Sequence, residues 1–232
     1  MISHVIFTKR AFNAIITETI DKNPVETGGI FIGYLLDNGI CVVVETIPPG
    51  IKTVNQRAYF EYDSDFINYL SNVIAKQYVG NLHVLGLWHR HPGSMDTFSL
   101  TDDGTNILFA RNNGKYGSIS ALVNCDPKLR LTMYHVDSNC MYTPIEWSVD
   151  DGIIPADLLK LRYEDTSNLP ILGKNRHSEI LNTPEDICTD DNSNEPVAHS
   201  QCESSQVEEV SNYTICNAVE DFCKIIRRLL NK

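Results

Sequence analysis

The chain has 232 residues and a formal net charge of −11 at pH 7, from 19 basic and 30 acidic side chains. This acidic balance disfavours a general binder of nucleic acids or of anionic membranes. Hydrophobic residues make up 42% of the chain, which suits a globular protein with a substantial core. The length allows one sizeable domain and an appendage.

The composition also predicts where the protein resides. The N-terminus has no cationic segment followed by an apolar stretch, and no apolar run approaches the length of a membrane span. The seven cysteines are odd in number and form no CxxC pair, a pattern typical of reduced thiols. We therefore expect a cytoplasmic protein without a membrane partner.

Hydrophobic periodicity predicts alternating strands and helices along the first 150 residues. The asparagine–glycine turn at 37–39 is a strong hairpin signal between two apolar runs. Strands are expected at 4–7, 28–36, 40–47, 58–62, 119–124, 129–136 and 141–147, helices after Thr8 and after Asp63, and a loop at 48–56. These elements predict a mixed α/β (α+β) fold, with helices flanking a curved, mostly antiparallel sheet. The apolar residues that recur at helical spacing in the first helix are expected to extend to Ile20.

One apolar run, residues 84–88, leads directly into two histidines and ends at a proline. Residues two apart in a strand share a face, so His89 and His91 can point at one spot. On a helix the same pair would diverge by about 200°. The spacing therefore favours a strand that presents two imidazoles together, although two such histidines also occur by chance.

A carboxylate follows at the expected start of the next helix. Asp102 lies there, with Ser99 and Thr101 as candidate N-caps. Two imidazole nitrogens and one carboxylate leave one position open on tetrahedral zinc. That arrangement is typical of a catalytic site rather than a closed structural one.

A second acidic residue lies upstream in Glu26-Thr27-Gly28-Gly29. A hydrolytic zinc site needs a carboxylate that is not a ligand, placed to take a proton from water. Alone, Glu26 is more often a turn residue that faces solvent. The two glycines would let the backbone come close to the metal site; a bulge at the start of the strand is the alternative.

The residues that alternate with the histidines should face the other side of the strand. We expect Trp88 to lie in the core. For Arg90, a charged group that reaches solvent at the sheet edge is favoured over a substrate contact.

Composition changes after Gly173. Residues 177–210 contain nine acidic residues and no lysine, arginine or aromatic residue, so they cannot bury enough apolar area to fold. We therefore divide the chain into a domain at 1–173, an acidic flexible linker at 174–210 and a C-terminal amphipathic helix at 211–232. That helix is expected to dock, either on its own domain or on a partner.

Glu26-Thr27-Gly28-Gly29, followed by His89-x-His91-Pro92 and Ser99-x-x-Asp102, resembles the signature of the JAMM (MPN-plus) zinc metalloproteases, in particular their bacterial JAB branch. Every position of that signature is filled, and the resemblance covers roughly residues 1–150. It implies the MPN/JAMM architecture, which is cytidine deaminase-like, and makes residues 1–173 a catalytic domain.

The resemblance also implies roles for these residues. One catalytic zinc ion would be held by His89, His91 and Asp102, with water as the fourth ligand. Glu26 would act as the general acid and base, and Ser99 would donate a hydrogen bond to the oxyanion.

The family cleaves peptide or isopeptide bonds at the C-terminus of ubiquitin or ubiquitin-like proteins. The substrate would then be a ubiquitin-like protein or its conjugates, in a bacterial ubiquitin-like conjugation or antiphage system with E1-like and E2-like partners. Two alternatives remain: processing of a sulfur-carrier protein, and a non-catalytic MPN-type scaffold that docks partners through the tail helix.

Overall fold

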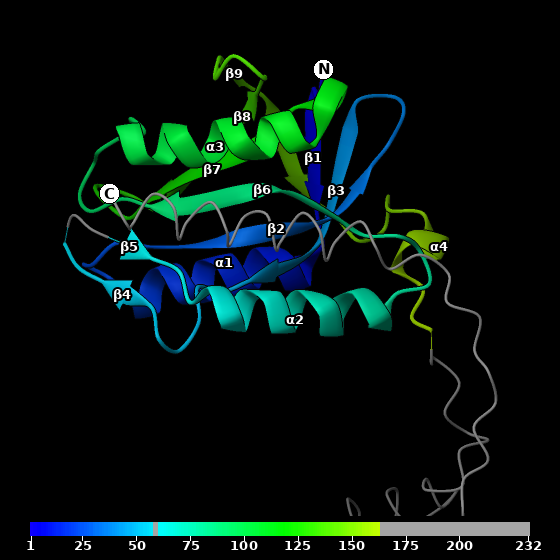
Figure 1. Ribbon diagram of the computed structural model, residues 1–232, viewed down its shortest axis with the longest axis horizontal. Helices are drawn as coiled ribbons and strands as arrows, with labels where there is room; N and C mark the ends of the chain where they lie inside the picture. Colours follow the sequence, from blue (N-terminus) through cyan, green and yellow to red (C-terminus); the bar gives the residue numbers. More distant parts are fainter. Residues whose placement is uncertain (58–59, 163–232) are drawn as a thin grey trace, which may run out of the picture. The chain divides into compact units, whose positions relative to one another are not determined.

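The computed structural model describes residues 1–57 and 60–162, so the predicted linker at 174–210 and the helix at 211–232 lie outside the described residues. Helices cover both faces of a central sheet (Figure 1). The helices are α1 (Lys9–Asp21), α2 (Ser64–Gln77), α3 (Leu100–Asn112) and α4 (Ala156–Leu159). The strands are β1 (His4–Phe7), β2 (Thr27–Leu35), β3 (Ile40–Ile47), β4 (Val54–Asn55), β5 (Phe60–Glu61), β6 (His83–Arg90), β7 (Ser118–Asn124), β8 (Arg130–Val136), β9 (Tyr142–Pro144) and β10 (Glu146–Val149).

Side-chain caps fix where the three long helices begin. Thr8, Asp63 and Ser99 each accept a hydrogen bond from a backbone N–H in the first turn of α1, α2 and α3. All three starts agree with the prediction from the sequence. The prediction that the buried apolar face of α1 includes Ile20 is wrong, because Ile20 is 61% exposed.

The main sheet has eight strands in the order β10-β1-β3-β2-β6-β7-β8-β9. Four of its pairings are antiparallel and three are parallel. The predicted mixed α/β fold with a curved, mostly antiparallel sheet is confirmed. The predicted hairpin is also present, with Gly39 at φ 81° in the turn between β2 and β3.

The predicted strand at 141–147 is in fact two strands. β9 pairs with β8 and β10 pairs with β1, so the two occupy opposite ends of the strand order. Only Ile145 separates them in the chain, and its N–H donates to the Met133 carbonyl of β8 at 3.0 Å. Because one residue spans only a few ångströms, the two edges must come together. The sheet therefore curls back on itself.

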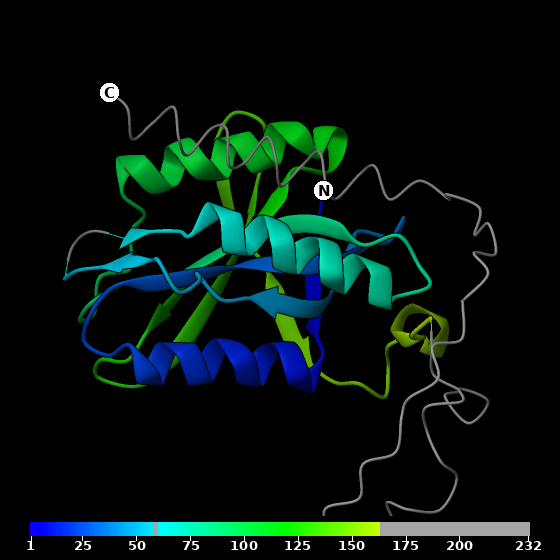
Figure 2. The ribbon, with the colours of Figure 1, turned by 60° about the horizontal axis from the view of Figure 1, so that its bottom comes forward.

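Two apolar cores lie on the two faces of this sheet. Leu87 of β6 belongs to the core that includes Ile67 of α2 and Phe109 of α3. The next residue, Trp88, belongs to the core that includes Ile15 of α1. In Figure 2, α1 lies on the opposite side of the sheet from α2 and α3. Side chains thus alternate between two buried environments along β6.

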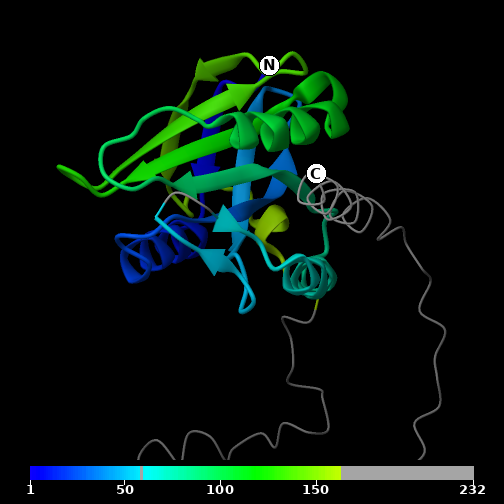
Figure 3. The same cartoon turned by 60° about the vertical axis from the view of Figure 1, so that its left-hand side comes forward.

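The predicted loop at 48–56 contains a strand. Within it, β4 forms a small antiparallel ribbon with β5, in which Val54 pairs with Glu61. Figure 3 shows this ribbon beside the end of β6. In the described ranges, 1–57 and 60–162, no helix has the length and apolar character needed to cross a membrane.

Candidate metal centre and active site

The end of β6 brings two imidazoles to one carboxylate. His89 is 5% exposed and His91 is 3% exposed, and their ring centres are 6.2 Å apart. The Asp102 carboxylate lies against both rings: its Oδ1 is 3.5 Å from His89 Nε2, and its Oδ2 is 3.4 Å from His91 Nε2. Both rings therefore lie on the same face of the strand, as the His-x-His spacing predicts.

A capping box fixes the Asp102 carboxylate at the first turn of α3. The Ser99 hydroxyl accepts from the Asp102 N–H at 3.2 Å, and the Ser99 N–H donates to Asp102 Oδ2 at 2.7 Å. The same carboxylate oxygen faces His91. The cap that starts the helix thus also orients the carboxylate, and it holds Ser99 next to the site.

Glu26 joins this group from the start of β2. Its Oε1 is 3.7 Å from His91 Nε2. Two residues of the β4 segment hold its backbone: the Asn55 side-chain amide donates to the Glu26 carbonyl at 2.8 Å, and the Gln56 carbonyl accepts from the Glu26 N–H at 3.0 Å. One potential ligand atom from each of the four groups, Glu26, His89, His91 and Asp102, lies within 4.8 Å of the others.

The residues present fit a zinc ion. Both ring nitrogens of His89 and of His91 are buried and lack a hydrogen-bond partner within the described part of the chain. Buried polar groups normally have such partners, and a metal ion supplies one for an imidazole nitrogen. Two imidazoles and one carboxylate are a donor set typical of catalytic zinc.

Burial and neighbouring charges set the protonation states of these groups. Burial lowers the pKa of His89, which favours the neutral ring that a metal requires. Burial acts to raise the pKa of Asp102, but His89, His91 and Ser99 together hold it well below its ordinary value. His89 is therefore favoured as a neutral imidazole and Asp102 as an ionised carboxylate. Burial acts to lower the pKa of His91, but the Asp102 and Glu26 carboxylates raise it above its ordinary value, so a metal ion would have to displace a proton there.

Glu26 differs from Asp102 in its proton affinity. Burial raises the pKa of Glu26 and the charge of Asp102 raises it further, while His91 and Arg90 act in the opposite direction. The net result is a carboxyl group whose pKa lies above its ordinary value. Such a group is better suited to exchange a proton near neutral pH than an ordinary glutamate is.

Residues 8–113 match the family described as prokaryotic homologs of the JAB domain. The chain carries a prokaryotic JAB domain. The matched segment contains all five residues for which the resemblance implied a role, so the predicted membership is confirmed, while the roles themselves remain predictions.

The solved structures similar to the chain include a solution structure of a protein from Desulfitobacterium hafniense, with 15% sequence identity and a TM-score of 0.46; the match covers 63% of this chain and 92% of that one. No curated protein matches the chain significantly.

Two aromatic rings wall the JAB-domain site beside His89. Phe60 and Tyr62 meet the His89 ring edge to face, with ring centres 5.8 and 6.1 Å away. Burial raises the pKa of Tyr62 well above its ordinary value, so its hydroxyl stays protonated. The sequence alone predicts only that both residues lie in a strand. Their position just before the capping residue Asp63 is the signal that could have placed them near the site.

The glycines after Glu26 permit close packing of β2 against Trp88, rather than against the metal-site groups as expected. A Cβ at Gly28 would lie 2.6 Å from the Trp88 carbonyl oxygen, and one at Gly29 would lie 2.5 Å from the Trp88 ring nitrogen. The register shift between β2 and β6 falls at Phe31/Ile32, away from both glycines. The bulge considered for these residues is therefore not at this position.

On the other face of β6, one prediction is confirmed and one is wrong. Trp88 is fully buried and donates from its ring nitrogen to Thr46 Oγ1 at 3.0 Å. Arg90 does not reach solvent, because it is only 1% exposed. Its guanidinium donates to the Val25 carbonyl at 2.5 Å and to the Asn23 side-chain oxygen. The turn between α1 and β2 thus covers its charged end.

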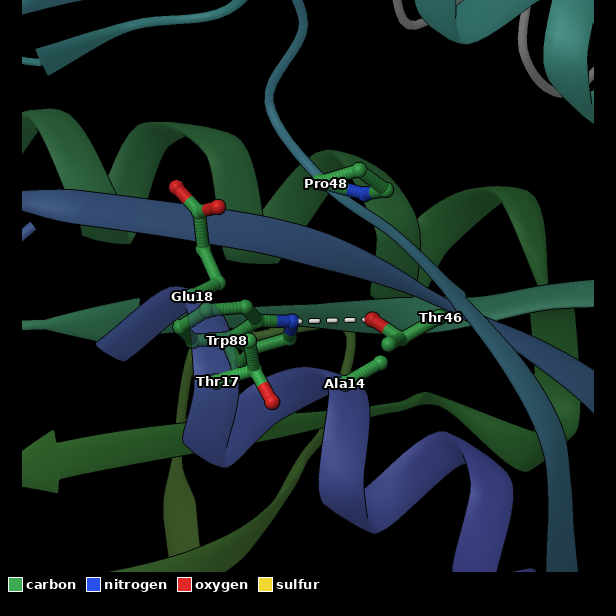
Figure 4. Close-up of a pocket in the computed structure, with 6 residues that line it drawn as sticks. All are labelled: Ala14, Thr17, Glu18, Thr46, Pro48 and Trp88. Atoms are coloured by element: carbon green, nitrogen blue, oxygen red, sulfur yellow. Dashed lines mark hydrogen bonds between the residues drawn. The ribbon is translucent and has the colours of Figure 1, made fainter. Parts of the chain in front are cut away.

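A pocket of about 280 Å³ lies on this same face (Figure 4). It is lined by Ala14, Thr17, Glu18, Thr46, Pro48 and Trp88. None of the four clustered metal-site groups lines it, so the pocket is separate from the JAB site.

Arg130 pairs with Asp96 in the loop between β6 and α3, and two further contacts anchor this loop. The Asn124 side chain donates to the Met95 carbonyl at 2.8 Å, and Phe98 stacks on Tyr142 with ring centres 4.6 Å apart. The second anchor directly precedes Ser99. The sequence does not predict these contacts of Asn124 and Tyr142, because their partners lie in distant segments of the chain.

Proposed function

We propose that the chain is a zinc-dependent peptidase or isopeptidase that cleaves after the C-terminal glycine of a ubiquitin-like protein. One observation carries this proposal: the Glu26 carboxylate, whose side chain is 14% exposed, lies 3.7 Å from His91 Nε2, in a group that already contains two imidazoles and Asp102. A purely structural zinc site would have no use for this additional acid. The match to the JAB family supports the same conclusion.

His89, His91 and Asp102 would hold the zinc ion. When bound, zinc supplies a Lewis acid and lowers the pKa of water at the site to about 7. Glu26 then accepts the proton of the attacking water and delivers it to the leaving amine. Its raised pKa suits this exchange.

Ser99 is the proposed donor to the oxyanion. Its hydroxyl oxygen accepts the Asp102 N–H, which leaves the hydroxyl proton available for a second hydrogen bond. Ser99 is exposed, so a substrate carbonyl can reach it. The capping box fixes its position before substrate binds, as oxyanion stabilisation requires.

The surroundings favour an extended, narrow substrate. An extended peptide is most easily bound as an added strand, and only residues without side chains would pass close to the metal. We expect the loops at 48–56 and 93–98 to form the walls, because Asn55 in the first contacts Glu26 and Asn124 anchors the second at Met95. A C-terminal diglycine tail meets these requirements.

In the cell, we propose a cytoplasmic role in a bacterial ubiquitin-like conjugation or antiphage system, with E1-like and E2-like proteins as partners. The sulfur-carrier alternative predicts the same chemistry on a different diglycine protein. Parallel assays on both substrate types therefore distinguish the two.

The test is cleavage of a fusion that carries a ubiquitin-like C-terminus, by the zinc-loaded full chain. Glu26→Gln should keep its zinc and lower turnover by a factor of about 10² or more. Glu146→Gln, an exposed acid on β10, serves as the matched control and should retain full activity. Equal turnover of the wild type and Glu26→Gln would contradict the mechanism.

A second substrate tests the steric argument. Replacing the terminal diglycine by two alanines should strongly reduce cleavage; similar rates would contradict the narrow passage. A protein that binds zinc but cleaves neither a ubiquitin-like nor a sulfur-carrier fusion would instead support the non-catalytic scaffold.

A further inference from the structure

We propose that Arg90 is a positioning residue, which fixes the general base Glu26 relative to the metal-binding strand by holding the turn that precedes it. This inference rests on the proposed function for its catalytic part. Its structural part, that Arg90 holds the turn, is independent of any activity.

Three hydrogen bonds from two distant parts of the chain hold the backbone around Glu26, in addition to the local bond from the Val25 N–H to the Lys22 carbonyl. The Gln56 carbonyl accepts the Glu26 N–H, and the Asn55 amide donates to the Glu26 carbonyl. Both come from the β4 segment. The third bond, from the Arg90 guanidinium to the Val25 carbonyl at 2.5 Å, holds the other end of the peptide group that contains the Glu26 nitrogen.

Arg90 alone among these three partners belongs to β6. It lies between His89 and His91 in the chain, and its register partner on β2 is Thr27, the residue after Glu26. Because alternate residues of a strand face opposite sides, its side chain leaves from the face that the histidines do not use. It then reaches back to Val25 and Asn23. The Arg90 side chain thereby adds a second connection between the base and the ligands, beside the backbone pairing of β2 with β6.

Stability of the fold does not by itself explain an arginine at this position. Arg90 is 1% exposed, its Nε has no hydrogen-bond partner among the described residues, and the oxygens that accept its hydrogen bonds belong to neutral groups. A buried charge that is held by neutral groups is costly. Glu26 is an acidic residue on which this charge acts. A role in the placement of Glu26 accounts for the arginine.

The first arm of the test separates turnover from binding. In the zinc-loaded full chain, Arg90→Met keeps much of the apolar stem but removes the donors. We expect kcat to fall about 10- to 100-fold, with zinc content and KM unchanged, and Arg90→Lys to recover part of the loss. Arg111→Met, at an exposed arginine of α3, is the control and should behave as wild type.

A double substitution shows whether Arg90 acts through Glu26. In the Glu26→Gln background, Arg90→Met should cause no further loss of residual turnover, because there is no base left to misplace. An equal loss in both backgrounds, or a change confined to KM, would overturn the positioning role.

The second arm does not depend on activity. Amide hydrogen exchange in residues 22–27 should be faster in Arg90→Met than in wild type, with little change in α3. Unchanged exchange would overturn the proposal. If the wild type hydrolyses no substrate, the proposed function fails while this measurement still decides whether Arg90 holds the turn. Should Arg90→Met not fold, Asn23→Ala removes one acceptor and keeps the arginine, and it should speed exchange in the same segment.

Discussion

The two faces of β6 are equally buried but differ in how their polar groups are satisfied. On one face, the ring nitrogens of His89 and His91 lack hydrogen-bond partners within the described residues. On the other face, Trp88 donates to Thr46 and the terminal nitrogens of Arg90 donate to Val25 and Asn23, while Arg90 Nε has no hydrogen-bond partner among the described residues. Burial therefore does not distinguish the two faces; the convergence of two imidazoles and two carboxylates on one of them does.

This difference has an energetic basis. A buried polar atom without a hydrogen bond costs about 1–3 kcal/mol. The histidine face therefore lowers the stability of the metal-free fold, and a bound metal ion would offset the cost. The Trp88 face stabilises the fold whether or not metal is present. Substitutions on the histidine face should therefore mainly reduce metal binding. Substitutions on the Trp88 face should mainly reduce stability.

The largest expected effect is on the histidine face. His91→Ala should reduce bound zinc from about one equivalent to almost none and lower hydrolysis to background, because two ligands hold zinc far less tightly than three. It should cost the metal-free protein little stability. His83→Ala, a partly exposed histidine of the same strand, is the control. Elemental analysis and the cleavage assay measure both variants, and full zinc content in His91→Ala would refute the ligand assignment.

On the opposite face, substitution should reduce stability more than it reduces zinc binding. Trp88→Ala removes a fully buried indole and should lower the free energy of unfolding by about 3–5 kcal/mol. Denaturant titration measures this loss. The folded fraction should still bind zinc, because Trp88 points away from the ligands. A variant of wild-type stability that has lost its zinc would show that the two faces are not independent.

Ser99 combines a structural and a catalytic role, and two variants separate them. Ser99→Ala should lower the free energy of unfolding by about 1 kcal/mol through loss of the N-cap, whereas Ser99→Gly should cost only a few tenths. Both lack the hydroxyl donor, so both should lower turnover by about 10²- to 10³-fold. A rate that follows stability, with Ser99→Gly nearly as active as wild type, would make Ser99 only a capping residue.

The smallest effect concerns Glu45, a buried acid that does have partners. It accepts a hydrogen bond from Tyr78 at 2.9 Å and pairs with Arg10 at 3.1 Å, yet burial outweighs both and raises its pKa. The folded state therefore holds this proton more tightly than the unfolded state, and stability should fall as pH rises from about 4.5 through the folded-state pKa. Glu45→Gln should flatten this decline by an amount on the order of 1 kcal/mol. Unfolding measured at several pH values tests the difference; an unchanged slope would mean that partners fully compensate for burial.

Local sequence signals determined much of this protein. The Asp37-Asn38-Gly39 turn specified the hairpin, and Thr8, Asp63 and Ser99 specified the helix starts, because each acts on backbone groups within a few residues. The spacing of His89 and His91 placed both rings on one face, because strand alternation is also a local property. The resemblance then identified the JAB family from short motifs.

Only the tertiary structure decided the long-range relations. It divided the expected strand at 141–147 between the two edges of the sheet, because β9 pairs with the preceding strand β8 whereas β10 pairs with β1, at the other end of the chain segment. It brought Glu26 next to His91, and it turned Arg90 inward to hold the turn before Glu26. No pattern of neighbouring residues encodes these outcomes. Each depends on which residues, distant in the chain, the folded sheet brings close together.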